Sequence, residues 1–210
     1  MLNRPERVFD IIAICFVSFL LIANVSATKL FHVGDLIFDG GAVLFPLTYV
    51  LGDVLAEVYG IKKARRVIVI GFVMSIIASL TFYIVQLLPP APDYEHQEAF
   101  EAVLGFLPRI VAASLVAYLI GQLLNAFVLT LMKKKWGADR LWVRLLGSSV
   151  VGEAADTIIF CTIAFFGILV GADFWNYVVV GFVFKIAVEI VFMPVTYRVI
   201  AWVKGDMKSV

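Results

Sequence analysis

Carboxylates, amides and a lysine occur inside long apolar segments of this chain, and their spacing is helical. Glu153 and Asp156 stand three residues apart, and Lys185 and Glu189 stand four apart. Residues at these separations are neighbours on one face of a helix. Charge inside a bilayer is costly, and it usually faces a cavity or a partner. The chemistry that these residues predict is the binding of a polar solute.

Two further polar stripes have the same spacing. One stripe consists of Tyr49, Asp53 and Glu57, and the other of Ser114, Tyr118, Gln122 and Asn125. Asn24 adds an amide in the first apolar segment, while Lys185 and Arg109 are the candidate cations. At a rise of about 1.5 Å per residue, most of these groups fall near the middle of their segments. A polar layer drawn from several helices at one depth is typical of a transporter.

Structural roles are open for the same residues. Lys185 and Glu189 could form an ion pair within one helix, and the amides could hydrogen-bond neighbouring helices. The acids at 53 and 57 could pair with basic residues at the inner surface. Glu153 and Asp156 are harder to explain in this way, because no basic residue of their own segment lies nearby. They need protonation, a cation from another helix, or a ligand.

The composition indicates that a bilayer surrounds these segments. Of the 210 residues, 62% are hydrophobic and only 16% are charged, and the mean hydropathy is +1.00. Average soluble domains are about 45–50% apolar and about 25% charged. A soluble, disordered, collagen-like or disulfide-rich secreted protein is thereby excluded. Cys15 and Cys161 lie in apolar runs and are expected to be small buried hydrophobes, so no metal or cofactor is predicted.

Six segments are long and apolar enough to cross the hydrocarbon core, which requires about 20 residues. They are residues 8–30, 42–59, 67–88, 110–132, 145–170 and 174–203. The first is too long for a secretory signal, so it is expected to be a retained helix. The predicted fold class is an all-α integral membrane protein, with one six-helix transmembrane domain over residues 1–210.

The charged residues predict the orientation of this bundle. Fourteen of the 17 basic residues flank the chain ends or fall in two connectors on one side. They are Arg4, Arg7, Lys62, Lys63, Arg65, Arg66, Lys133, Lys134, Lys135, Arg140, Arg144, Arg198, Lys204 and Lys208. Cytoplasmic loops attract Lys and Arg, so both termini are expected in the cytoplasm. The longest opposite connector, 89–108, is expected to be a solvated acidic loop with a short amphipathic helix over 98–107, or alternatively a lid.

Other function classes lack support in the sequence. GxSxG and HExxH motifs are absent, as are a Walker motif and a histidine within a span, which argues against an intramembrane enzyme or a one-chain ATP-driven pump. A structural membrane protein would not need so many buried acids, and no basic stripe suggests nucleic acid. Residues 50–57 and 151–156 share a short pattern of glycine, acid and apolar residues. Two three-helix halves could therefore form an inverted repeat.

Several motifs resemble the queuosine-precursor transporter family, in the vitamin-uptake-transporter-like group. The longest is residues 45–60, with Pro46-Leu47-Thr48-Tyr49, then Asp53, then Glu57-Val58-Tyr59-Gly60. Further matches are residues 113–118, 122–125 and 152–160, and the series Lys185, Glu189, Pro194 and Tyr197. Asn125 stands where family members often carry Asp. The resemblance spans nearly the whole chain.

The resemblance implies import of 7-cyano-7-deazaguanine, and as a further candidate its 7-aminomethyl relative, across the bacterial inner membrane for queuosine synthesis in tRNA. It implies a six-helix bundle similar to the substrate-binding subunits of vitamin importers. Another vitamin, a nucleobase or a small heterocycle is the alternative solute. The energy source is open between proton coupling and facilitated diffusion, and a partner ATPase is less favoured. A homodimer could form through Gly71, Ser75 and Ala78.

A guanine-like substrate suits the polar residues. One carboxylate can accept hydrogen bonds from N1–H and the 2-amino group together, and Glu153 or Asp156 is expected to do so. The remaining predicted substrate-binding residues are Gln122 and Asn125 for the carbonyl and pyrrole edges, Tyr118 or Tyr49 for stacking, Lys185 for holding the acids ionised or reaching O6, and Asn24. Asp53, Glu57 and Glu189 are expected to serve coupling or gating.

Overall fold

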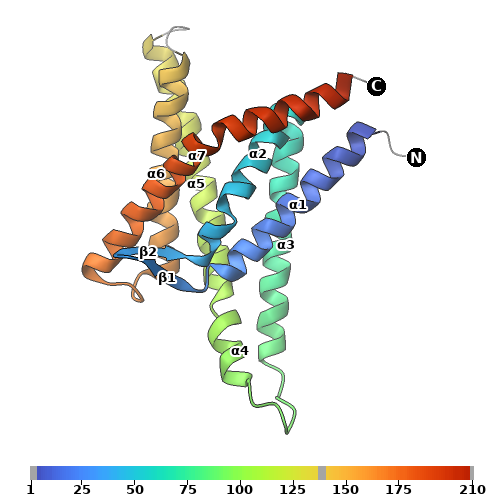
Figure 1. Ribbon diagram of the computed structural model, residues 1–210. Coiled ribbons are helices and arrows are strands. Elements are labelled where there is room, and N and C mark those ends of the chain that lie inside the picture. Colours follow the sequence, from blue (N-terminus) through green and yellow to red (C-terminus); the bar gives the residue numbers. More distant parts are fainter. Residues whose placement is uncertain (1–3, 137–140, 209–210) are drawn as a thin grey trace. The chain divides into compact units, whose positions relative to one another are not determined.

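The computed structural model describes residues 4–136 and 141–208, and the side chains of residues 6–132, 134 and 147–203 (Figure 1). Its elements are α1 (Arg4–Ser26), β1 (Leu30–Val33), β2 (Leu36–Asp39), the 3₁₀ helix η1 (Gly40–Val43), α2 (Phe45–Tyr59), α3 (Ile61–Gln86), α4 (Gln97–Leu104), α5 (Leu107–Trp136), α6 (Leu141–Phe165) and α7 (Gly171–Lys208). The predicted helical membrane fold is confirmed.

Five helical stretches among the described residues are long and apolar enough to cross a membrane. They are Glu6–Ser26, Ile61–Gln86, Gln97–Met132, Gly147–Phe165 and Gly171–Val203. Many of their large apolar side chains are exposed, including Val69, Ile77 and Leu123. Exposed apolar surface of this extent marks a membrane-facing protein, because lipid rather than water covers it.

The second predicted span is shorter than expected. The prediction was a helix over 42–59, but α2 covers only Phe45–Tyr59 and η1 occupies Gly40–Val43 before it. Fifteen α-helical residues extend about 22 Å, whereas the hydrocarbon core is about 30 Å thick. The 3₁₀ turn contributes further length, because its rise is about 2.0 Å per residue. A sixth crossing, made by η1 and α2 together, stays a prediction.

A β-hairpin replaces the end of the first predicted helix. Residues 8–30 were expected to be helical, but α1 ends at Ser26 and β1 begins at Leu30. Strands β1 and β2 pair through a turn at Gly34 and Asp35, where Gly34 has a φ of 61°. Two-residue turns of this kind need positive φ, which glycine adopts without steric cost. A Gly-Asp pair between two apolar tetrads is the sequence signal that the helix prediction missed.

Two connectors also differ from the prediction. Lys62, Lys63, Arg65 and Arg66 were expected between helices, but they lie in the first turns of α3, where all four are exposed. Gly60 alone joins α2 to α3, and its φ of 85° allows the abrupt change of direction. Helix α6 was expected to reach residue 170, but it ends at Phe165, and Gly167 has a φ of 88° in the turn that follows.

Some basic residues used for the orientation fall outside the described part of the chain. Arg140 belongs to this group, and so do the side chains of Arg4, Lys133, Lys135, Arg144, Lys204 and Lys208. The placement of both termini in the cytoplasm stays a prediction.

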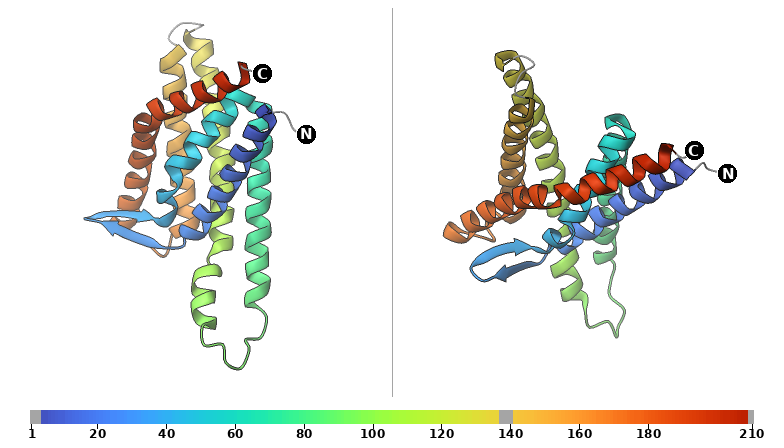
Figure 2. Two further views of the ribbon diagram at one scale, coloured as in Figure 1. Left: turned by 45° about the vertical axis from the view of Figure 1, so that its right-hand side comes forward. Right: turned by 45° about the horizontal axis from the view of Figure 1, so that its top comes forward.

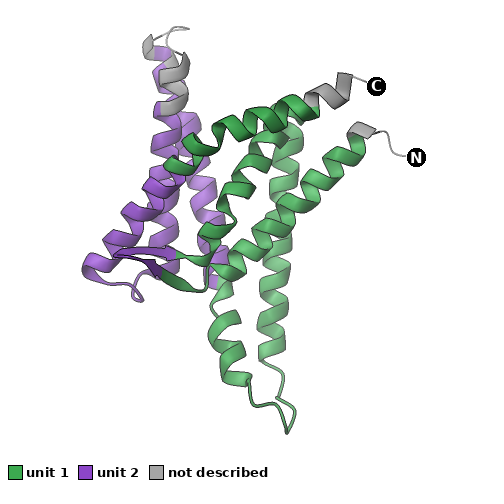
Figure 3. Ribbon diagram, viewed as in Figure 1, with its two compact units in different colours: residues 1–31, 39–108, 187–210 green, residues 32–38, 109–186 purple. Residues whose placement is uncertain are grey.

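The chain divides into two compact units, and α7 belongs to both (Figure 3). Unit 1 comprises residues 1–31, 39–108 and 187–210, and unit 2 comprises residues 32–38 and 109–186. In unit 1, helices α1, α2 and α3 lie side by side (Figures 1 and 2). Their core contains Phe16 of α1, Val54 and Leu55 of α2 and Val67 of α3. These apolar faces fix the helices that carry Asn24, Tyr49 and Asp53.

Unit 1 also holds the long connector between α3 and α5, over residues 89–108. Helices α3 and α4 run in opposite directions, and exposed residues connect them (Figure 2). The Gln97 side-chain amide at the start of α4 donates to the carbonyl of Gln86 at 3.1 Å, which ties α4 to the end of α3. A short helix at Gln97–Leu104 therefore exists where residues 98–107 were expected to form one.

The face proposed for a homodimer is used inside unit 1. Gly71 and Ser75 of α3 are buried. A Cβ on Gly71 would lie 2.9 Å from Leu20 Cδ2 of α1, and Ser75 Oγ accepts a hydrogen bond from Asn24 of α1. Gly71 and Ser75 therefore pack α3 against α1, and the homodimer stays a prediction.

In unit 2, α5 and α6 run antiparallel and side by side (Figure 2). The first half of α7 packs against α6, where the edge of Tyr177 meets the ring of Phe165 with centroids 5.0 Å apart. Strand β2 packs on the same half of α7 through Phe38 and Phe184, whose centroids are 5.6 Å apart. Helices α5 and α6, the first half of α7 and part of the hairpin thus form the framework that holds the polar groups of this unit.

Candidate functional site

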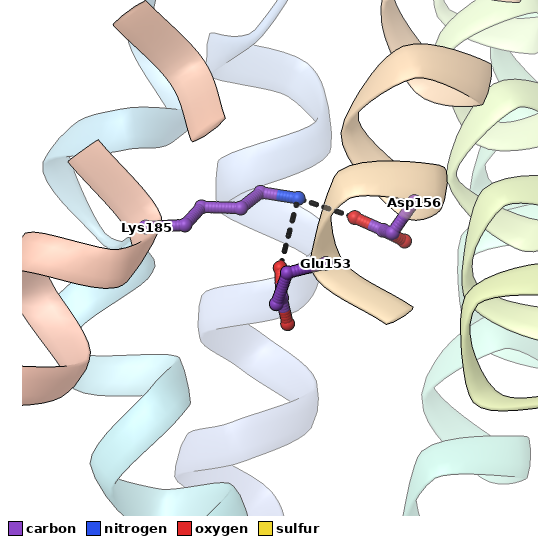
Figure 4. Close-up of polar contacts among 3 residues, drawn as sticks. All are labelled: Glu153, Asp156 and Lys185. Carbon is purple, nitrogen blue, oxygen red and sulfur yellow. Dashed lines mark hydrogen bonds and ion pairs between the residues drawn. The ribbon is translucent and has the colours of Figure 1, made fainter. Parts of the chain in front are cut away.

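Lys185 of α7 and two carboxylates of α6 form a charged cluster within unit 2 (Figure 4). The Lys185 ammonium contacts Asp156 Oδ2 directly and lies 3.6 Å from Glu153 Oε2. The side chains of Lys185, Asp156 and Glu153 are 20%, 23% and 33% exposed. The cation that the two acids required therefore comes from another helix, as one of the open alternatives anticipated.

The cluster follows from helix geometry. Glu153 and Asp156 are three residues apart on α6, so both carboxylates leave the same face. Lys185 lies in the middle of its helix, and its long side chain reaches across to that face (Figure 4). Residues 153–156 and Lys185 all lie inside stretches long and apolar enough to span a membrane. The cluster is thus a half-buried polar site on the membrane-spanning part of unit 2.

Two glycines bring α5 and α6 together beside this cluster. A Cβ on Gly121 would lie 3.0 Å from both the Gly152 carbonyl oxygen and Asp156 Cβ. A Cβ on Gly152 would lie 2.9 Å from both the Gly121 carbonyl oxygen and Asn125 Cβ. Only hydrogen fits at either position, so the two backbones can approach closely. Sequence reasoning missed this contact, although Gly121 directly precedes Gln122 and Gly152 directly precedes Glu153.

Part of the predicted stripe on α5 therefore lies next to the carboxylates of α6. Asn125 is half-buried beside Gly152, and Tyr118 is half-buried about two turns before Asn125 on α5. Gln122 is exposed. Unit 2 thus contains six of the predicted substrate-binding residues, and the structure brings Glu153, Asp156, Lys185 and Asn125 into one neighbourhood.

The other predicted residues belong to unit 1. Asp53 of α2 and Glu189 of α7 lie close enough for their carboxylates to interact electrostatically. Tyr49 is half-buried, with its ring 6.2 Å from that of Phe45, and Glu57 is exposed. The assignment of these groups to stacking, coupling or gating stays a prediction.

Asn24 has a structural contact in unit 1. Its side-chain amide is buried and donates to Ser75 Oγ at 3.2 Å, and the Ser75 hydroxyl donates to the Gly71 carbonyl at 2.9 Å. Hydrogen bonds of this kind join neighbouring helices within membranes. The amide nitrogen of Asn24 is therefore engaged in packing α1 against α3.

Arg109 was considered as a second cation of the polar layer, and this was wrong. Its Nε donates to the carbonyl of Ile163 and its terminal nitrogen to the carbonyl of Phe166, each at 2.6 Å. These carbonyls belong to the end of α6, where backbone acceptors have no partner within the helix. Arg109 therefore caps the C-terminal end of α6, far along the helix from Asp156.

Asn176 is a second residue that sequence reasoning missed. Its Oδ1 accepts from the backbone N–H of Ile37 at 3.1 Å, and its Nδ2 donates to the carbonyl of Asp35 at 2.8 Å. The side chain thereby extends the hydrogen bonding of the hairpin onto α7. The sequence signal that could have indicated this contact was an asparagine in the second turn of an otherwise apolar helix.

The family described as "Putative vitamin uptake transporter" matches residues 39–199. A protein of Bacillus subtilis named "Probable queuosine precursor transporter" is 34% identical over 89% of this chain and 82% of its own length. A protein of the same name from Haemophilus influenzae is 28% identical over 76% of this chain and 67% of its own length. The "Queuosine precursor transporter" of Escherichia coli is 28% identical over 76% of this chain and 71% of its own length. No solved structure matches the chain.

These matches define the class of the protein as a multi-pass membrane transporter rather than an enzyme. The chain belongs to the vitamin uptake transporter family, and the resemblance drawn from the motifs at 45–60 and 152–160 is confirmed.

Proposed function

We propose that this chain imports a queuosine precursor, 7-cyano-7-deazaguanine, across the bacterial inner membrane, and that 7-aminomethyl-7-deazaguanine is a second substrate. The names of three relatives support a queuosine precursor as the solute. The observation that carries the site is the cluster of Glu153, Asp156 and Lys185 inside membrane-spanning helices.

The chemistry of the base suits this cluster. A guanine-like ring presents N1–H and the 2-amino group side by side, and an ionised carboxylate can accept from both. Glu153 is assigned to this contact, because its distance to the Lys185 ammonium is the longer of the two and its side chain is the more exposed. Asp156 holds the ammonium, which is then positioned to donate to the ring carbonyl O6.

The α5 residues complete the proposed site. Asn125 lies beside Gly152 at the close contact of α5 and α6, so its amide can pair with the pyrrole edge of the base. Tyr118 is assigned to stacking on the ring and Gln122 to a further polar contact. The carboxylates in unit 1, Asp53 and Glu189, are assigned to coupling.

The test is uptake in a bacterium that can neither make nor import the precursor. Cells that express this chain receive 7-cyano-7-deazaguanine, and queuosine in their tRNA is measured. We expect restoration by the natural chain and at least about a tenfold loss of uptake with E153Q or D156N, because hydrogen bonds to a charged group are removed. The amount of each variant in the membrane is measured in parallel.

E98Q is the matched control, because it makes the same chemical change on exposed α4. It should restore queuosine as well as the natural chain does. Normal uptake by both E153Q and D156N would place the solute elsewhere. If the natural chain reaches the membrane and restores no queuosine, the precursor is the wrong solute, and another vitamin or small heterocycle is tested instead.

A further inference from the structure

The charged cluster of unit 2 contains more negative groups than positive ones. Two carboxylates and one ammonium give a formal charge of −1 at Glu153, Asp156 and Lys185. The other described charged side chains of unit 2 lie at its ends. Asp35 is in the hairpin turn, Arg109 and Lys134 are near the two ends of α5, and Asp173 is in the first turn of α7. Within unit 2, the charge that a bound solute meets is therefore set by the cluster.

The lysine contacts its two acids differently. Its ammonium touches Asp156 and stands 3.6 Å from Glu153, so one carboxylate is in direct contact with the cation and the other lies farther from it. All three side chains are more than half buried and still partly exposed, so a solute can reach them where solvent screening is reduced. In such surroundings, one added or removed charge changes the affinity for a cation strongly.

We propose that Lys185 sets the charge preference of the solute site, and this inference rests on the proposed function. With Lys185 present, the formal charge of −1 is low enough to admit a neutral deazapurine through its N–H donors, and it also attracts one that carries an ammonium group. Without Lys185, the cluster has a formal charge of −2 and selects the cationic compound. The lysine thus keeps the transporter open to neutral solutes.

The test uses two probes that share the guanine-like edge and differ in charge. They are 7-cyano-7-deazaguanine, which is neutral, and 7-aminomethyl-7-deazaguanine, which carries an ammonium. Their affinities for the purified full chain are measured by competition, and the ratio of the two affinities is the readout. Loss of a contact to the shared edge weakens both probes alike, so the ratio reports charge.

Three variants separate charge from contact. K185Q should raise the ratio of cationic to neutral affinity by about tenfold or more, because the repelling charge near the solute is gone. K185R keeps the charge and should leave the ratio near that of the natural chain. The double variant K185Q/D156N removes both members of the close pair, restores the formal charge of −1, and should also return the ratio to the natural value.

Each measured ratio either supports the inference or overturns it. An unchanged ratio in K185Q overturns the inference, and so does a double variant whose ratio stays as high as that of K185Q. Either result leaves the proposed function intact, provided that the natural chain binds one of the two probes. Binding of neither probe by the natural chain overturns the proposed function, and the inference falls with it.

Discussion

Lys185 and Arg109 are both cations that donate to α6, but they meet the helix at different kinds of acceptor. Lys185 contacts side-chain carboxylates in the middle of the helix, whereas Arg109 contacts the main-chain carbonyls of Ile163 and Phe166 at its end. The C-terminal end of a helix carries a partial negative charge in addition to unpaired carbonyls. One cation therefore belongs to the proposed solute site, and the other stabilises the end of α6.

This difference predicts the behaviour of Arg109 variants. R109Q should lower the free energy of unfolding by about 1–2 kcal/mol, because charge-assisted hydrogen bonds and the favourable helix-end interaction are lost together. The measurement is the thermal denaturation of the purified protein in detergent. The ratio of affinities for the cationic and neutral probes should equal that of the natural chain.

R109K is the matched variant, since it keeps the charge and cannot donate from two nitrogens in a planar fork. Its stability should lie between those of R109Q and the natural chain. A change in the ratio of probe affinities with R109Q would contradict the assignment of Arg109 to the end of α6, and would return it to the solute site.

At the scale of elements, the contact between α5 and α6 determines where the site residues lie. Each of Gly121 and Gly152 faces the backbone carbonyl of the other, and a Cβ at either position would approach that oxygen to 3.0 Å or less. Asp156 and Asn125 are the side chains beside this contact. Separation of the two helices would therefore move an acid and an amide of the proposed site apart.

G152A should reduce uptake through this separation. The new methyl group meets the Gly121 carbonyl and Asn125 Cβ, neither of which is the far end of a flexible side chain, and overpacking of this kind costs about 1–3 kcal/mol. We expect a raised KM for 7-cyano-7-deazaguanine, with protein still present in the membrane.

G181A is the control for that variant. A Cβ on Gly181 of α7 would lie 3.5 Å from Thr157 Cγ2, which is an ordinary van der Waals distance. The same chemical change should therefore leave KM unaltered. Equal KM values for G152A and the natural chain would show that the close contact does not position the site.

Sequence reasoning predicted the elements better than their ends and contacts. Long apolar runs predicted each of the five described stretches that can cross a membrane, because burial in lipid demands length and hydropathy. The same runs could not predict that α1 ends at Ser26, since only three residues separate the helix from Leu30, where largely apolar sequence resumes and continues through the strands β1 and β2. Gly34-Asp35 and Gly60 carried that information through backbone conformation.

For the site, too, sequence reasoning predicted which residues share a helix face better than it predicted which groups those residues contact. The three-residue spacing of Glu153 and Asp156 placed them on one face, and a cation from another helix was one of three alternatives left open for them. Lys185 was named among the candidate cations, but whether it reaches the two acids depends on how α7 is rotated about its axis, and hydropathy does not fix this rotation in a helix that is apolar all round. Arg109 was misplaced because its position in sequence does not show which carbonyls it reaches.

At the scale of the whole molecule, whether α2 crosses the membrane decides whether the two ends of the chain lie on the same side. Among the described residues, five helical stretches meet the length for a crossing, and five crossings alone would put the two ends on opposite sides. A sixth crossing by η1 and α2 puts both ends on the same side. The exposed basic side chains at the start of α3 favour the sixth crossing, because such residues stay in the cytoplasm.

Cysteine labelling in intact cells tests this crossing. Cys15 and Cys161 are replaced by alanine, and single cysteines are introduced by D35C in the hairpin turn and K62C in the first turn of α3, both at exposed positions. We expect a membrane-impermeant maleimide to label D35C in intact cells and K62C only after lysis. R7C supplies the inner reference, and D93C, which follows α3, should be labelled in intact cells only if α2 crosses. If D35C and K62C react alike, α2 does not cross, and the two chain ends lie on opposite sides of the membrane.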